Sequence, residues 1–131
     1  MSSLELRFEG VLPRPPRRSV EEVAKCLGWS YEGVEAGRHV LAIPLDAPLL
    51  KAPKVSLLKA PKVYIREEPG RYVGRGAAPA GELTFEILIE KAGETYLWLF
   101  QVVQRGLINM LGRHFFEGLA SRLVERIMRC L

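Results

Sequence analysis

The stretch ELTFEILIEKAGETYLWLFQVV, residues 82–103, decides the fold class. Apolar side chains alternate with polar ones on either side of Ala92-Gly93, and a period of two is typical of β-strands that are buried on one face. With Ala92-Gly93 as the turn, Phe85 lies opposite Phe100. One face of this hairpin is then wholly apolar and aromatic, so we predict that it packs against the core.

The opposite face of the predicted hairpin is only half polar. Glutamate and threonine side chains share it with four aliphatic ones, Leu88, Leu97, Leu99 and Val103. Soluble monomers rarely leave such a patch uncovered. We therefore expect cover either from a second copy of the chain, in a homodimer, or from within the chain, by a short helix at 19–27 or the proline-rich segment before it.

Residues upstream of the hairpin predict a strand followed by a short helix. Residues 4–11 alternate between apolar and charged side chains, and the PRPPRR segment at 13–18 ends that strand because proline cannot donate to a β-ladder. Ser19 with Glu22 three residues later forms a capping box, which indicates a helix at 19–27, and Gly28 is placed to end it.

The region between this helix and the hairpin is β-like. We predict strands near residues 31–35, 38–45, 54–66 and 71–76. It contains a direct repeat, LLKAPKVS at 49–56 and LLKAPKVY at 57–64, whose prolines favour an edge strand or an irregular connection. The glycines in GRGAAP, residues 74–79, lack the pattern of a phosphate loop, so Gly74 and Gly76 are expected to make room for bulky neighbours or a bend.

Residues 106–131 are predicted to form a long amphipathic helix. From Gly112 onward one face carries apolar side chains and the other carries charged ones. Before Gly112 the apolar residues Leu107 and Leu111 fall on the other side. Either the helix starts later than its pattern suggests, or its first turns touch something different.

Composition and length indicate one soluble α+β domain, residues 1–131. Hydrophobic residues make up 48% of the chain and charged residues 26%, no run of eighteen apolar residues exists, and the amino terminus lacks the apolar centre of a signal peptide. We therefore expect a cytoplasmic protein. With 14 Glu, 13 Arg and a single Asn, the composition is typical of proteins selected for high temperature, which predicts a thermophilic source.

Candidate catalytic and metal-binding residues are few. His39 and His114 are the only histidines and lie far apart in the sequence, and only one Asp is present, so we predict no metal site, no catalytic residue and no cofactor. Cys26 and Cys130 are interpreted as two buried thiols, with a disulfide between them as the alternative. Neither has the surroundings of a cysteine nucleophile.

The order of predicted elements resembles the START-like, Bet v 1-like helix-grip superfamily. LRFEGVLPRPPRRSVEEVAKCLG resembles its opening strand and helix, and GLINMLGRHFFEGLASRLVERIMRCL its last helix, as in proteins similar to an accessory protein of carbon monoxide dehydrogenase. The resemblance implies a curved antiparallel sheet of about six strands wrapped around the long C-terminal helix. It also implies a space for an apolar ligand, although members of the superfamily include cyclases and hydroxylating enzymes.

Three functions remain open at the level of sequence. The first is non-enzymatic binding of a lipid-like or other apolar small molecule between sheet and helix. The second is contact with nucleic acid through the basic segments 14–18 and 51–62, which is less favoured because no aromatic residues are interleaved with the basic ones. The third is an enzyme of the cyclase or hydrolase kind. The aromatic and aliphatic side chains predicted to contact the apolar ligand, if they are not simply core, are Phe85, Ile87, Tyr96, Trp98, Phe100, Phe115 and Leu119.

Overall fold

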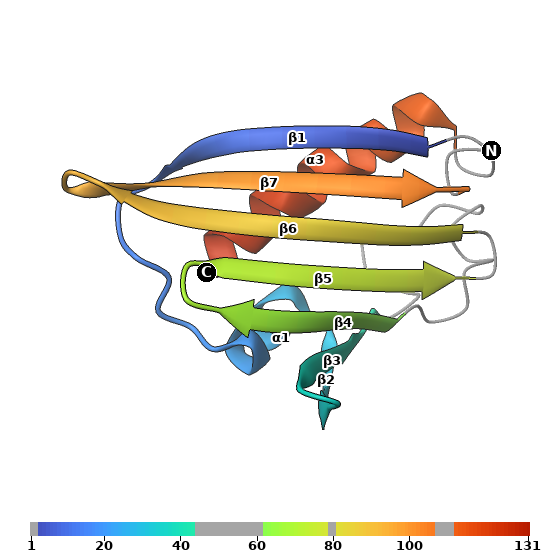
Figure 1. Ribbon diagram of the computed structural model, residues 1–131, viewed down its shortest axis with the longest axis horizontal. Helices are drawn as coiled ribbons and strands as arrows, with labels where there is room; N and C mark the ends of the chain where they lie inside the picture. Colours follow the sequence, from blue (N-terminus) through green and yellow to red (C-terminus); the bar gives the residue numbers. More distant parts are fainter. Residues whose placement is uncertain (1–2, 44–61, 79–80, 107–111) are drawn as a thin grey trace.

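One antiparallel sheet and two helices make up the computed structural model, which describes residues 3–43, 62–78, 81–106 and 112–131. The seven strands lie in the order β1-β7-β6-β5-β4-β3-β2. Figure 1 shows α3 lying diagonally behind the sheet, from the β1 side towards β5. The elements are β1 (Ser3–Leu12), α1 (Val20–Leu27), β2 (Ser30–Glu35), β3 (Arg38–Ala42), β4 (Lys62–Glu68), β5 (Arg71–Ala78), β6 (Gly81–Ala92), β7 (Thr95–Arg105) and α3 (Arg113–Cys130).

The β6–β7 hairpin forms with the predicted faces but in a different register. Its turn is Gly93-Glu94 rather than Ala92-Gly93, because Gly93 takes a positive φ of 65° at the first central position, as a two-residue hairpin turn of the II′ class requires. Phe85 is therefore paired with Val102 instead of Phe100. Because the register differs by two residues, every side chain stays on its predicted face.

Helix α1 begins where the capping box predicts. The Ser19 side chain accepts a hydrogen bond from the Glu22 backbone N–H at 3.2 Å, and the Glu22 carboxylate accepts one from the Ser19 backbone N–H at 2.9 Å. Gly28 ends the helix in the left-handed conformation, with a φ of 80°. The apolar side of α1 packs through Val20 and Ala24 against Leu41 of β3.

The last helix is shorter than the sequence pattern suggested. It begins at Arg113, directly after Gly112, whose φ of 84° lies outside the helical region. The later start of the helix therefore accounts for the change in the direction of the apolar stripe at Gly112. Residues 107–111 lie outside the described residues. Among the described residues, neither helix is long and apolar enough to span a membrane.

The predicted strand at 54–66 is displaced in the structure. β4 spans Lys62–Glu68, paired with β3 and β5. Most of the repeat at 49–64, with both of its prolines, lies outside the described residues. The other predicted strands match described ones, and β6 and β7 extend close to their predicted limits.

A disulfide joins the two helices, so the preferred interpretation of two buried thiols is wrong. Cys26 near the end of α1 is bonded to Cys130 at the end of α3, across 104 positions of sequence. The sequence could not show this because the bond depends on the angle at which α3 meets α1. The Arg126 side chain also donates to the Leu27 carbonyl oxygen at 3.0 Å, which further attaches α3 to α1.

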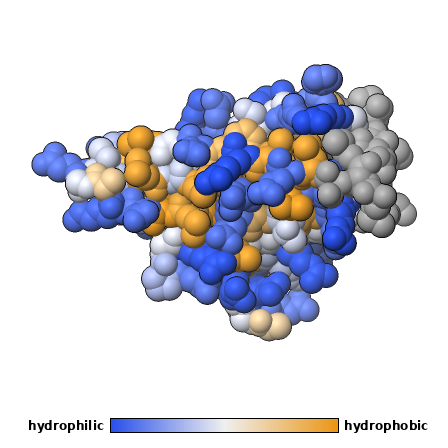
Figure 2. Space-filling view, turned by 45° about the horizontal axis from the view of Figure 1, so that its top comes forward, coloured by the Kyte–Doolittle hydropathy of each residue, from blue (hydrophilic) through white to orange (hydrophobic). Residues whose placement is uncertain are grey.

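Both helices lie on the same face of the sheet, which we call the inner face. It carries Phe85 and Ile87 of β6, Phe100 and Val102 of β7, and Phe8 of β1, and the α3 residues Val124, Ile127 and Met128 belong to the same hydrophobic cluster. The opposite, outer face is not covered by either described helix, which corrects the alternative that the helix at 19–27 covers it. Figure 2, turned so that the β1 side comes forward, shows hydrophobic surface interrupted by hydrophilic residues.

Candidate functional site: a cavity between the sheet and the helices

A cavity of about 190 Å³ lies between the inner face and the two helices. This volume exceeds the ~150 Å³ of an engineered dry cavity that binds benzene, and is below the ~300–1,000 Å³ of drug-sized ligand sites. The cavity therefore suits a small or slender molecule. Its lining comes from α1 (Val20, Val23, Leu27), from β3 to β7 (Leu41, Lys62, Val63, Ile65, Tyr72, Gly76, Gly81, Leu83, Phe85, Ile87, Phe100, Val102), from α3 (Phe116, Leu119, Ala120, Leu123, Val124, Ile127) and from the neighbouring residues Arg18, Trp29, Ile43 and Leu131.

Glycine creates part of the space on the inner face. Gly74 of β5 is paired with Phe85 of β6, and a Cβ atom built at Gly74 would overlap the Phe85 ring. Gly10 of β1 is likewise paired with Trp98 of β7, and a Cβ atom built at Gly10 would overlap the Trp98 indole. The prediction that Gly74 makes room for a bulky neighbour is therefore confirmed, and the ring it accommodates lines the cavity.

Four of the seven predicted ligand-contacting residues line the cavity. Phe85, Ile87 and Phe100 reach it from the sheet, and Leu119 reaches it from α3. Phe85 and Phe100 stack with their ring centroids 5.6 Å apart and their planes 9° apart. These side chains thus contribute a flat aromatic wall.

The other three predicted residues lie outside the lining. Trp98 is half-buried in the hydrophobic cluster, next to Gly10, and Tyr96 lies near the hairpin end of β7. Phe115 is replaced in the lining by its neighbour Phe116, which is buried. A helix turns by about 100° per residue, and a stripe read from the sequence does not fix which of two adjacent phenylalanines points inward.

Tyr72 supplies a polar group that the sequence analysis missed. It lines the cavity, and no described residue forms a hydrogen bond with its hydroxyl. Burial, and secondarily the nearby Glu67 carboxylate, raise the pKa of Tyr72 above its ordinary value, so the phenol is neutral at pH 7. The sequence could have indicated that Tyr72 faces inward, because on the predicted strand at 71–76 it lies on the same face as Gly74 and Gly76.

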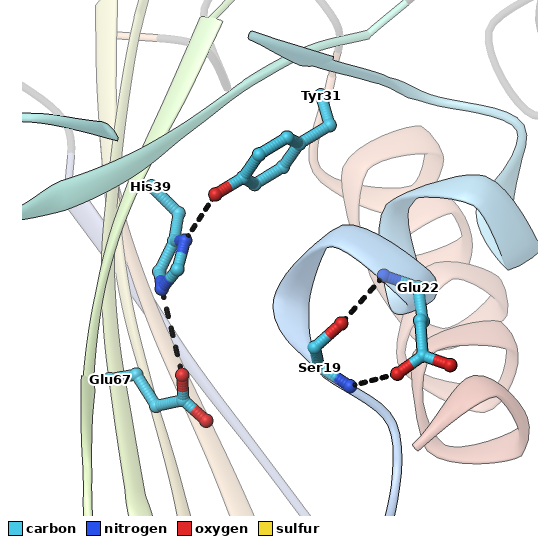
Figure 3. Close-up of polar contacts among 5 residues, drawn as sticks. All are labelled: Ser19, Glu22, Tyr31, His39 and Glu67. Carbon is cyan, nitrogen blue, oxygen red and sulfur yellow. Dashed lines mark hydrogen bonds and ion pairs between the residues drawn. The ribbon is translucent and has the colours of Figure 1, made fainter. Parts of the chain in front are cut away.

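A second polar group on the inner face lies beside α1 (Figure 3). The Tyr31 hydroxyl is 2.7 Å from Nδ1 of His39, and Nε2 of His39 is 3.5 Å from a Glu67 carboxylate oxygen. These three side chains connect β2, β3 and β4. None of them lines the cavity, so their arrangement accounts for His39 as a hydrogen-bonded structural residue.

The described residues offer no group of three His, Cys, Asp or Glu side chains that could hold a metal ion. The side chains around the cavity provide apolar contact, one phenol and the two cations Arg18 and Lys62. Lys62 is paired with Glu32 at 3.1 Å. Tyr64, Arg75 and Gln101 lie on the outer face, away from the cavity.

Comparison with solved structures identifies the architecture. A conserved protein from Geobacillus kaustophilus is 17% identical, with a TM-score of 0.63 over 97% of this chain and 91% of its own. Ara h 8.0201 is 13% identical, with a TM-score of 0.64 over 98% of this chain and 94% of its own. The protein has the helix-grip fold. The fold implied by the resemblance of the opening and closing segments is thus confirmed.

One of the solved structures that share the helix-grip fold is named for an enzymatic activity. An aromatase/cyclase from a Streptomyces species has a TM-score of 0.59 with 9% identity over 98% of this chain and 91% of its own. No protein-family model and no curated protein sequence matches the chain. The function of this helix-grip protein therefore has to be argued from its own cavity.

Proposed function

We propose that the protein binds a lipid-like or other apolar small molecule, without chemical conversion, in the cavity between the sheet and α3. The observation that carries this proposal is the cavity of about 190 Å³ with an almost entirely apolar lining. Removing apolar ligand surface from water into such a site is favourable by roughly 25 cal/mol per Å². An apolar molecule of matching size would therefore gain free energy by entering the cavity.

A neutral fluorescent probe, N-phenyl-1-naphthylamine, tests the proposal directly. Its fluorescence rises when it enters an apolar site, so the purified protein should bind it saturably, at about one probe per chain. Mass spectrometry of organic extracts of the purified protein is the companion measurement, because a resident ligand would be released into the extract.

A cavity-filling variant provides the specific test. Ala120→Phe places a large side chain in the cavity lining and should reduce probe binding by about tenfold or more, because an occupied cavity leaves no room for the probe. Ser121→Phe is the matched control, since Ser121 is the next residue of α3 and is exposed. Equal probe binding by the wild type and Ala120→Phe would show that the cavity is not the binding site.

Contact with nucleic acid is the alternative. The described part of its predicted basic segments contains Arg14, Arg17 and Arg18, together with Lys62, which is already paired with Glu32. Binding through phosphates weakens steeply as salt rises. Retention on a single-stranded oligonucleotide column at low salt, lost at high salt, would support this alternative, and no retention at low salt would reject it.

A further inference from the structure

Four arginines gather at a second hollow of about 310 Å³ beside the cavity. Arg14, Arg17 and Arg18 come from the connection between β1 and α1, and Arg129 comes from the last turn of α3. Among the described residues, no acidic side chain lines this hollow. Segments from opposite ends of the sequence thus concentrate positive charge at one place.

The hollow and the apolar cavity are neighbours. Arg18 and Leu131 line both of them. A molecule that occupies the cavity with its apolar part therefore has Arg18 and the neighbouring arginines at one side, while Lys62, the other cation of the lining, is paired with Glu32. The arrangement fits an amphipathic ligand, with its apolar part in the cavity and its charged end at the arginines.

No described acidic side chain neutralises the positive charge of this arginine cluster. None of the four arginines forms an ion pair with a described carboxylate. Glu22 is close enough to Arg18 to be affected by its charge, but the Glu22 carboxylate accepts the backbone N–H of Ser19 in the capping box. The cluster retains unused N–H donors, since each guanidinium has five.

The backbone that carries the cluster is held in place. The Arg17 backbone N–H donates to the Leu131 carbonyl oxygen at 3.1 Å, and the Arg18 guanidinium donates to the Cys130 carbonyl oxygen at 3.0 Å. The Cys26–Cys130 disulfide ties α1 to α3 beside them. Positions fixed in this way reduce the entropy lost when an anion is bound.

We propose that Arg14, Arg17, Arg18 and Arg129 bind the anionic head group, a carboxylate or a phosphate, of a molecule whose alkyl part occupies the cavity. Guanidinium groups suit both head groups because their N–H donors pair with two oxygens at once. The four side chains are exposed, so the attraction is expected to weaken with added salt. This proposal rests on the proposed function and adds to it the chemical class of the ligand.

Three alkyl compounds with matched chains, together with two small anions, test the proposal on the full-length protein. Decanoate and decyl phosphate carry an anionic head, decan-1-ol carries a neutral one, and acetate and inorganic phosphate carry the head without the chain. Displacement of N-phenyl-1-naphthylamine measures the alkyl compounds, and calorimetry measures the small anions. We expect the two alkyl anions to bind about tenfold or more tightly than decan-1-ol at low salt, and the small anions to bind more weakly than either.

The double variant Arg14→Gln/Arg129→Gln identifies the residues responsible. Neither side chain forms a hydrogen bond or ion pair with another described residue, so the fold should be kept. The affinity for alkyl anions should fall to about that for decan-1-ol, while decan-1-ol and the neutral probe bind as before. Arg75→Gln/Arg122→Gln removes the same charge at exposed positions elsewhere and should leave the preference unchanged.

The outcomes separate this proposal from the one on which it rests. Binding of the neutral probe and decan-1-ol, without any preference for alkyl anions, would overturn the head-group site and leave the apolar cavity intact. Failure of every alkyl compound and of the probe would overturn the cavity function itself. An oligonucleotide that binds through the same arginines, with no preference among the alkyl compounds, would assign the cluster to nucleic acid and reject the proposal.

Discussion

At position 74, beside the cavity, the structure has room for the hydrogen atom of glycine but not for a methyl group. The Phe85 ring lies where a Cβ of residue 74 would be, and the same ring stacks on Phe100. A methyl group at this position has to displace the ring, either into the cavity or against its neighbour. The cost of such overpacking in a core is typically about 1–3 kcal/mol.

We expect Gly74→Ala to lower the free energy of unfolding by about 2 kcal/mol and to weaken binding of the neutral probe. For stability, Gly76→Ala is the matched control on the same strand, because its added Cβ would meet its nearest atoms at 3.6 and 3.8 Å, which is ordinary contact. Urea unfolding and probe titration measure the two effects. Equal stabilities of the two variants would contradict the role given to Gly74.

Tyr72 gives the protein a predictable response to alkaline pH. Burial, and then the Glu67 carboxylate, raise the pKa of Tyr72 above its ordinary value of 10.0, so the folded state holds the phenolic proton more tightly than the unfolded chain does. The stability from this difference is fully present below the unfolded pKa and is lost as pH rises through the folded pKa.

Tyr72→Phe should therefore lose less stability than the wild type when the pH is raised above about 10. Urea midpoints measured from about pH 9 to about pH 11 compare the two proteins. Tyr64→Phe, on the outer face of β4, is the control for removing a phenol elsewhere. Identical pH profiles for wild type and Tyr72→Phe would refute the assignment.

At the scale of elements, the helices are coupled by a bond that periodicity cannot reveal. Cys26 is exposed on α1, whereas Cys130 is buried at the end of α3. The disulfide closes a loop over a sequence separation of 104. In the chain-entropy model, a cross-link over about 100 residues stabilises the folded state by up to about 4.7 kcal/mol, and measured values are typically about 2–4 kcal/mol.

Cys26→Ala should lower the free energy of unfolding by about 3 kcal/mol through loss of this cross-link. The exposed cysteine is the better one to replace, because little packing is lost with it. Dithiothreitol should destabilise the wild type by a similar amount and leave Cys26→Ala unaffected. A wild type that does not respond to dithiothreitol, with reduction verified by mass spectrometry, would show that the bond adds no stability.

The elements themselves were largely predictable from the sequence. The capping box of Ser19 and Glu22, with Gly28 after it, set the limits of α1, because these signals depend only on neighbouring residues. That Phe85 and Phe100 face inward was also predictable, because the alternation of apolar and polar residues fixes the face and an error of two residues in register preserves it.

One missed feature depends on a local choice of turn, and the others depend on how distant elements meet. The register of β6 and β7 depended on which residue adopts a positive φ, and both Gly93 and its neighbours were compatible with a turn. The choice of Phe116 over Phe115 depended on the rotation of α3 against the sheet. The gathering of Arg14 with Arg129 required the two ends of the chain to meet, and no local pattern records that.

At the scale of the whole molecule, the outer face of the sheet is where a second copy is expected to bind. Val11 of β1 and Leu97 of β7 are paired across the strands and are 58% and 47% exposed. Glu9 and Arg7 lie on the same face, so it carries charges of both signs. A surface with both signs can complement its own copy when two are related by a two-fold axis.

We expect light scattering at micromolar concentration to give twice the chain mass of 14.7 kDa, and Leu97→Glu to give the monomer mass. A carboxylate in the middle of the contact would have to be buried without a partner, which is costly. Ser121→Glu, on the exposed side of α3, adds the same charge away from this face and should remain dimeric. A wild type with the mass of one chain would refute self-association.

The Cys26–Cys130 bond also makes most of the chain a covalent ring. Residues that precede Cys26 or follow Cys130 lie outside that ring, and β1 is the described strand among them. A protease that cuts one peptide bond within the ring opens it without releasing a fragment, because the two new pieces stay joined through sulfur. Protein nicked once in this way should run as two bands on a gel only after reduction, and it should keep binding the neutral probe until then.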